Sequence, residues 1–268
     1  MSALLAQSSM YPTAISSMSN SRLLRAYLIE AKYEFLHMLR APAFAIPFLV
    51  LPAVVYLFFG VLIAGSAKDA PAHVADYLFS GFAVLGVLGP ALFGSSVGLA
   101  IERDAGLLRL KRALPAPPGA YLIAKMLVAM AFAAIAAGSV LVAAVIAGKI
   151  DLSASQLLMM SLVFVAGTIP LSSIGLFIGT HTSGSAAPGF ANLAYFPMLY
   201  LSGLFVPLPK VLQHWTVIWP SFHIDQLALA AAGLRQFRFI DPQLAAGVLL
   251  LTTLLFGGLA LRRLQRSG

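Results

Sequence analysis

Charge-free apolar stretches alternate with short polar segments along this sequence. Four of these stretches cover residues 41–67, 77–101, 126–148 and 242–261. Each is long enough to cross the roughly 30 Å hydrocarbon core of a bilayer as one α-helix. A longer stretch, 152–209, also lacks Asp, Glu, Lys and Arg. Its length suits two crossings of about 20 residues each.

A short segment of small and polar residues divides the stretch 152–209. Residues 180–188 are rich in Thr, Ser and Gly and end in Pro188, a composition typical of a helix break. We therefore predict an all-α polytopic membrane protein that forms a single transmembrane domain over residues 1–268. Its six predicted spans lie at about 43–65, 77–101, 122–147, 155–179, 188–206 and 243–261.

Two segments outside the spans also have helical patterns. Apolar residues recur at three- and four-residue spacing from Leu24 to Leu39, and basic residues such as Arg25 fall elsewhere on the same helix. Residues 22–40 are therefore predicted to form an amphipathic helix in the membrane interface. The long outer segment 207–241 is aromatic, and its amphipathic run is too short to cross. We expect re-entrant or surface helices there.

The distribution of charge sets the orientation of the chain in the membrane. With both termini inside, the cytoplasmic segments hold twelve basic and four acidic residues, and the outer segments hold five of each. The whole net charge of +8 thus lies inside, which is the positive-inside pattern of a multi-pass protein. Such an excess is a signal for orientation and anionic lipid, so we expect membrane lipid and no nucleic acid as partners. The twelve basic residues are Arg22, Arg25, Lys32, Arg40, Arg103, Arg109, Lys111, Arg112, Lys125, Arg262, Arg263 and Arg266.

The composition agrees with a membrane protein and limits its chemistry. Hydrophobic residues make up 60% of the chain, charged residues make up 10%, and the mean hydropathy of +0.92 exceeds that of soluble domains. Cysteine is absent, which excludes disulfides and thiolate chemistry. His214, His223 and Asp225 lack the tight repeat spacing of a metal site, so no metal is expected.

A dense cluster of charged residues, 102–112, separates the second and third predicted spans. It reads Glu-Arg-Asp-Ala-Gly-Leu-Leu-Arg-Leu-Lys-Arg and has a positive excess, so it must lie in water on the cytoplasmic side. Leu114-Pro115 follows it. A second element, Leu-Ser-Gly-Leu-Phe-Val-Pro, covers residues 201–207, and Pro-Ser-Phe-His follows at 220–223.

These elements, in this order on six spans, resemble the permease subunit of ABC-2-type transporters. The family includes bacterial drug-resistance, nodulation-factor and polysaccharide exporters. The resemblance covers nearly the whole chain, and it implies one half of a transporter in the bacterial plasma (inner) membrane.

The family resemblance also implies how energy reaches the chain. Permeases of this family form dimers, and a coupling helix in the first cytoplasmic loop docks on a separate nucleotide-binding subunit. Two copies of that subunit bind ATP and Mg²⁺. In this chain the coupling helix is expected at 102–112, where charged side chains bond to the partner and a glycine permits a close backbone turn. The implied coupling residues are Glu102, Arg103, Asp104, Gly106, Arg109 and Arg112.

The sequence contains no ATP site of its own. The pattern Gly-x-x-x-x-Gly-Lys-Ser/Thr does not occur, and no cytoplasmic segment is long enough to fold an ATPase domain. The apolar stretches that form the spans carry no Asp, Glu, Lys or Arg, which disfavours a carrier driven by a proton or sodium gradient. We therefore expect a transport subunit with no catalytic residue and no cofactor on this chain.

Two copies of the chain are expected to form a pathway at their interface, lined mainly by the second and fifth spans. Tyr195, Tyr200, Ser202 and Phe205 are the predicted contacts. The apolar lining suggests an amphipathic, drug-like or lipid- or glycan-linked substrate, and the family resemblance favours export. A heterodimer with a paralogous permease stays open as an alternative to the homodimer.

Two other classes of function stay open as alternatives. Gly94-x-Ser96-x-Gly98 resembles the nucleophile elbow of serine hydrolases, although it lies in an apolar helix without an obvious relay of histidine and acid. Ser183 is a second candidate nucleophile for such an intramembrane hydrolase. The other alternative is a non-transporting membrane scaffold or immunity protein.

Overall fold

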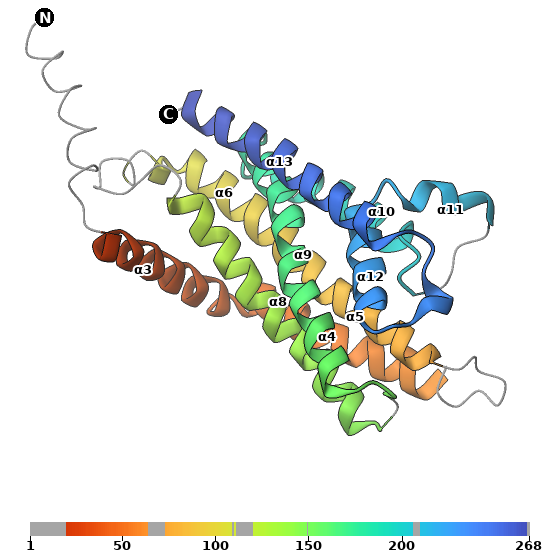
Figure 1. The fold of residues 1–268 in the computed structure, drawn as a ribbon. Helices are drawn as coiled ribbons and strands as arrows, with labels where there is room; N and C mark the ends of the chain where they lie inside the picture. Colours follow the sequence, from red (N-terminus) through yellow and green to blue (C-terminus); the bar gives the residue numbers. More distant parts are fainter. Residues whose placement is uncertain are drawn as a thin grey trace, which may run out of the picture.

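The computed structural model describes residues 20–63, 73–108, 110, 120–148, 150–205 and 210–266. These described residues form helices and no strand, which confirms the all-α prediction. Within them, five helical segments are long and apolar enough to cross a membrane (Figure 1). The five segments are Pro42–Ile63, Val74–Asp104, Tyr121–Ile146, Ala154–His181 and Pro242–Arg266.

The spanning segments follow the predicted ones closely, and two of them contain π-helical turns. Helices of the first half of the chain are α3 (Asn20–Leu39), α4 (Pro42–Tyr56), η1 (Leu57–Ile63), α5 (Val74–Gly89), η3 (Pro90–Gly94), α6 (Ser95–Asp104) and α8 (Ala120–Ile146). Those of the second half are α9 (Ala154–His181), α10 (Ala187–Tyr200), α11 (Lys210–Thr216), α12 (Pro220–Ala231), η4 (Arg235–Phe237) and α13 (Pro242–Arg266).

Helix ends coincide with local signals in the sequence. At the start of α9, the Ser153 backbone N–H donates to Gln156 Oε1 at 2.8 Å, and the Ser153 hydroxyl accepts from the Gln156 N–H. This capping box satisfies backbone donors that the first turn leaves free. At the end of α8, Gly148 has φ +63°, a conformation that glycine adopts without steric cost.

Helix α9 occupies the centre of the bundle, where it contacts α13, α6, α8 and α12 (Figure 1). Its glycines allow α6 and η3 to pack against it backbone to backbone. A Cβ at Gly175 would lie 2.8 Å from the Leu92 carbonyl oxygen, and one at Gly179 would lie 2.6 Å from that of Ser96. Glycines in α9 thus allow the spanning segment Val74–Asp104 to approach α9 more closely than larger side chains would permit.

The fifth predicted span is shorter as a helix than the sequence pattern indicated. Helix α10 has 14 residues and is about 21 Å long, less than the roughly 30 Å of hydrocarbon. A Cβ at Gly184, before α10, would lie 3.1 Å from Ile101, and Leu204, after α10, lies against Gly81. Segment 184–204 therefore runs antiparallel to 81–101, with its last residues in turns. The prediction of six spans therefore depends on whether α10 and the turns that follow it count as a fifth crossing.

The helix predicted over 102–112 is interrupted. Its first three residues form the last turn of α6, and the helix stops at Ala105 because Gly106 has φ +74°. Helical geometry resumes at 107–108 and 110, while Arg109 and 111–119 lie outside the described residues. The interruption divides the predicted coupling helix into two parts. Residues 102–104 continue α6, and the residues after Gly106 form a separate segment.

Segment 207–241 contains α11, α12 and the short η4 in its described part, and the two α-helices have different environments. Helix α12 is buried almost throughout and packs against α9, α13 and α5. Helix α11 exposes Val211 and Trp215. Helix α12 is thus an integral part of the helical bundle, whereas α11 lies at its periphery.

We expect Gly175→Ala to destabilise the fold because its methyl group would overlap the Leu92 carbonyl. Overpacking of this kind costs about 1–3 kcal/mol. Gly258 of α13 is the matched control, since a Cβ there meets nothing within 4 Å. Gly258→Ala should leave stability unchanged or raise it through helix propensity. The midpoint of thermal unfolding of the purified protein measures both, and equal midpoints would contradict the close η3–α9 contact.

Candidate functional site

A buried lysine joins three helices at the end of the bundle that holds α3 and the end of α13 (Figure 1). Lys125 of α8 is 1% exposed in its side chain, and its Nζ bonds to Glu34 of α3 and to Glu102 of α6, the latter at 2.9 Å. The Nζ also lies 5.1 Å from the centre of the Tyr121 ring. A buried ammonium needs such compensation, because its hydration is lost.

Packing of aromatic rings holds α3 in the position that this lysine requires. Phe35 of α3 lies 5.2 Å from Phe132 of α8, and Phe44 of α4 lies 6.1 Å from the same ring. The fully buried Phe132 thus anchors both flanking helices to α8. Glu34 is the neighbour of Phe35 in sequence, so the same contact presents its carboxylate to Lys125.

Arg103 closes the carboxyl end of α9. Its guanidinium donates to the carbonyl oxygens of Gly179, Thr180 and Thr182 at 3.1, 2.7 and 2.6 Å. The last carbonyls of a helix have no partner within the helix, and a cation there also interacts favourably with the helix dipole. Arg103 therefore binds the end of α6 to the end of α9.

Asp104 extends this connection to the turn that leads into α10. Its Oδ2 accepts from the Gly184 N–H at 2.6 Å, and its Oδ1 accepts from Arg103 Nη2 at 3.2 Å. Any displacement of the last turn of α6 would consequently act on the turn before α10. Three of the six predicted coupling residues, Glu102, Arg103 and Asp104, thus have partners within this chain.

The remaining predicted coupling residues lie beyond the helix break. Gly106 forms the break itself, and Arg109 and Arg112 fall outside the described residues. Two apolar residues that the sequence analysis did not single out, Leu107 and Leu110, are 42% and 67% exposed. The sequence did contain a signal for these two residues. They are apolar residues within a charged segment, where an apolar side chain is not needed for packing within the chain.

The four residues predicted to line a pathway do not form one site. Tyr195 lies edge-on to Phe93 at 5.4 Å, and Phe205 stacks on Phe82 at 4.7 Å, so both pack against the second spanning segment. Ser202 is buried and bonds to Ser221 of α12 at 2.6 Å. Tyr200 is 63% exposed. The exposed face of α10 to which it belongs also includes Phe190, Leu193 and Phe196.

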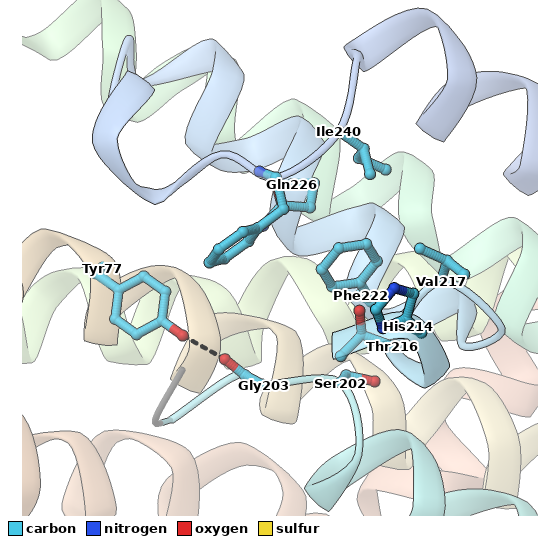
Figure 2. A pocket seen from close by; sticks show the side chains of 10 residues that line it. Tyr77, Ser202, Gly203, His214, Thr216, Val217, Phe222, Gln226 and Ile240 are labelled. Carbon is cyan, nitrogen blue, oxygen red and sulfur yellow. Dashed lines mark hydrogen bonds between the residues drawn. The ribbon is translucent and has the colours of Figure 1, made fainter. Parts of the chain in front are cut away.

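A cavity of about 310 Å³ lies beside Ser202, at the other end of the bundle from Lys125. Figure 2 shows it between the start of α5, the 202–203 turn, α11, α12 and the residues that precede α13. The Tyr77 hydroxyl donates to the Gly203 carbonyl across one side of it. The lining residues are Tyr77, Ser202, Gly203, His214, Thr216, Val217, Phe222, Gln226, Phe239 and Ile240.

A buried acid within a spanning segment corrects the expectation that the spans carry no charged residue, and a second buried acid lies beside that segment. Asp76, within the second spanning segment, is 1% exposed and bonds to the His73 ring at 2.8 Å. Asp225 of α12 is also 1% exposed and accepts from the Ser80 hydroxyl at 2.6 Å. Burial raises the pKa of the Asp225 carboxyl from 3.8 to about 7. The argument against a gradient-driven carrier therefore loses this support.

The serine-hydrolase alternative finds no relay in the described part of the chain. Ser96 is fully buried, and its hydroxyl has no hydrogen-bond partner there. Ser183 bonds to the Ser185 hydroxyl at 3.2 Å. A nucleophilic serine requires a base within hydrogen-bond reach, which neither has. The described residues also contain no group of three or more His, Cys, Asp or Glu that could hold a metal ion.

The fold and these contacts define a multi-pass membrane protein whose helix ends are tied to one another by charged side chains. The chain belongs to the ABC-2 type transporter family, which matches residues 25–239, from α3 to the segment before α13. It is 26% identical over 193 residues to YvfS of Bacillus subtilis (strain 168), a protein that carries the name of a transport permease. The alignment covers 71% of this chain and 78% of YvfS. The chain is therefore a transport permease by family.

We expect Lys125→Met to destabilise the protein strongly, because it leaves two largely buried carboxylates facing each other without a cation. Removal of one partner from a buried ion pair costs about 3–5 kcal/mol. Lys32→Met, at an exposed position of α3, is the matched control and should change stability little. Adding Glu34→Gln to Lys125→Met should restore part of the loss. Unfolding midpoints measure the series, and equal effects at the two lysines would refute the cluster.

The raised pKa of Asp225 predicts a pH-dependent stability. The folded carboxyl, with a pKa of about 7, holds its proton more tightly than the unfolded one at 3.8. The resulting stabilisation is present below about pH 4 and is lost as the pH rises to about 7. Asp225→Asn should lack this loss, whereas Asp241→Asn, at an exposed position, should keep it. Unfolding midpoints between pH 4.5 and 8 test the difference, and parallel curves for wild type and Asp225→Asn would contradict it.

Proposed function

We propose that this chain is the membrane-spanning half of an ATP-driven exporter, driven by a separate ATP-binding subunit through residues 102–112. Membership of the ABC-2 family supports an ATP-binding partner in general. The observation that carries the proposal is the pair of bonds that tie the last turn of α6 to the turn before α10, through Arg103 and Asp104. ATP and Mg²⁺ would be bound by the partner, two copies of which serve one transporter.

The proposed contact with the partner lies beyond Gly106. Leu107 and Leu110 expose apolar surface in a segment that also contains Arg109 and Arg112. Exposed leucines in a segment whose sequence is otherwise basic suit a groove that is apolar at its centre and acidic at its rim. Glu102, Arg103 and Asp104 would then act inside the permease, by holding this segment to the bundle.

Energy transfer follows from the order of these contacts. Closure of the partner ATPases displaces the segment after Gly106, and the last turn of α6 moves with it. Arg103 and Asp104 pass the displacement to residues 182–184 and so to α10. The π-helical turn at Pro90–Gly94 separates α6 from α5, and π-helical turns recur at functional positions in helices. We place the flexing point of the second span there.

The transport pathway is proposed between two copies of the chain. The exposed face of α10, with Tyr200 and Phe196, supplies apolar and aromatic surface, and the second span lies directly behind it. Such a lining suits an amphipathic, drug-like or lipid- or glycan-linked substrate. The proposed topology has both termini in the cytoplasm of a bacterium, with the fifth crossing made by α10 and residues 201–204. It agrees with the basic side chains at the ends of α6 and α13.

Leu110→Asp tests the proposed contact, because its side chain is exposed and the change should not affect folding. We expect Leu110→Asp to reduce co-purification of the cognate ATP-binding subunit at least tenfold, and to abolish ATP-dependent transport. Arg266→Asp, also at an exposed position of the same end, is the control and should retain both. Unchanged binding and transport by Leu110→Asp would sink the proposed contact. An ATPase that binds but supports no transport would favour the scaffold alternative.

A further inference from the structure

The cavity of Figure 2 has the construction of a small-molecule site within a single protomer. Its floor is buried, since Tyr77, Ser202 and Gln226 are 3%, 2% and 2% exposed, while His214 and Val217 are exposed at its rim. Its volume of about 310 Å³ is at the lower end of the 300–1,000 Å³ typical of ligand pockets. We propose that this cavity binds a small, uncharged aromatic compound that carries a hydroxyl group, of the phenol class.

The described lining of the cavity disfavours ionic ligands. None of its ten lining residues is Asp, Glu, Lys or Arg. Asp225 lies on the same helix as two lining residues, but its carboxylate is engaged by Ser80 of α5 and does not line the cavity. A charged ligand would lose its hydration here without gaining a counter-ion, which is strongly unfavourable.

The hydroxyl groups of Ser202 and Tyr77 in the floor donate their protons to protein acceptors, so their oxygens can accept a hydrogen bond from a ligand. The Ser221 hydroxyl donates to the Met198 carbonyl at 2.8 Å, so in the 2.6 Å bond between the two serines Ser202 is the donor. The Ser202 oxygen therefore keeps lone pairs. The Tyr77 hydroxyl likewise gives its proton to Gly203 and keeps its own acceptor capacity. A ligand that bonds to Ser202 and Tyr77 brings a donor, and a hydroxyl is the smallest neutral group that does so while it can also accept from the Gln226 amide.

The walls decide between an aromatic alcohol and a sugar. Phe222, Phe239, Val217 and Ile240 present apolar surface around the floor. A sugar carries hydroxyl groups on every side, and those against these walls would lose their water without finding a partner. A phenol has one hydroxyl for the floor and ring faces for the aromatic walls. The phenol class is thus the better fit.

The chain offers a local optical reporter for this site. Its only two tryptophans are Trp215 and Trp219. Trp215 stands between the lining residues His214 and Thr216, and Trp219 follows Val217 by two positions. Binding in the cavity should therefore change the tryptophan emission, whereas partition of a ligand into lipid elsewhere should leave it unchanged.

Three probes of similar size test the proposal on the full chain in lipid nanodiscs, with empty nanodiscs subtracted. They are 1-naphthol, naphthalene and 1-naphthoate, measured by calorimetry and tryptophan emission. We expect 1-naphthol to bind about five- to tenfold more tightly than naphthalene, through one hydrogen bond, and at least tenfold more tightly than naphthoate. Ser202→Ala should remove the advantage of naphthol over naphthalene. Equal binding of all three probes, or tighter binding of methyl glucoside, would overturn the proposal.

Two valine substitutions distinguish binding in the cavity from binding elsewhere on the surface. Val217→Phe fills the cavity and should abolish saturable naphthol binding, while Val211→Phe, at an 81% exposed position of α11 outside the cavity, should not. If the unfolding midpoint shows that Val217→Phe does not fold, Ile240→Phe serves as a second variant that fills the cavity. Unchanged binding by both filling variants would refute the site. Because no ATPase is present, this result is independent of the proposed coupling.

Discussion

The connection between α6 and the turn before α10 is the constraint on which the rest of this permease depends. Three consecutive charged side chains leave one helical turn in different directions. Glu102 turns inward to Lys125, Arg103 closes the end of α9, and Asp104 holds the Gly184 N–H. Glu102 and Arg103 cannot move alone, since movement would leave the buried Lys125 ammonium or the last carbonyls of α9 without a partner, while Asp104 adds a solvent-exposed bond to the same turn. The end of α6 is therefore rigidly joined to three neighbouring elements.

This rigid end contrasts with the π-helical turn two helical turns away. At η3 the backbone widens at Pro90, whose missing N–H already removes one helix bond. Yet α6 and η3 are pressed closely on Gly175 and Gly179 of α9. A displacement of α6 is thus more easily accommodated by bending at η3 than by separation from α9. The α5 half of the span can then stay against α12 while the α6 half moves.

Much of this architecture was accessible from the sequence, because long apolar stretches and the positions of Pro and Gly are local signals. The first four predicted spans agree with spanning helices to within four residues at both ends. The last predicted span also corresponds to a spanning helix, but this helix continues to Arg266. The short α10 was not accessible, because its apolar run continues past Tyr200 and only tertiary contacts with Tyr77 and Gly81 show where the helix stops. The count of charges treated Lys125 only as one of the cytoplasmic basic residues. Its burial was not accessible, because its partner Glu34 is 91 positions away in sequence.

The same limitation explains why the charged segment was assigned a single role. A sequence shows that 102–112 must reach water, but it cannot show which of its side chains turn back into the protein. The geometry divides the segment at Gly106, with structural bonds before it and exposed leucines after it. The two ends of the molecule then differ in chemistry: one is held by buried ion pairs, and the other surrounds a cavity lined by neutral residues. A ligand that enters that cavity meets hydrogen-bond acceptors and aromatic rings. The turn at 202–203, which supplies part of the lining, is the direct continuation of α10. Occupancy of the cavity and movement of α10 would therefore act on the same turn.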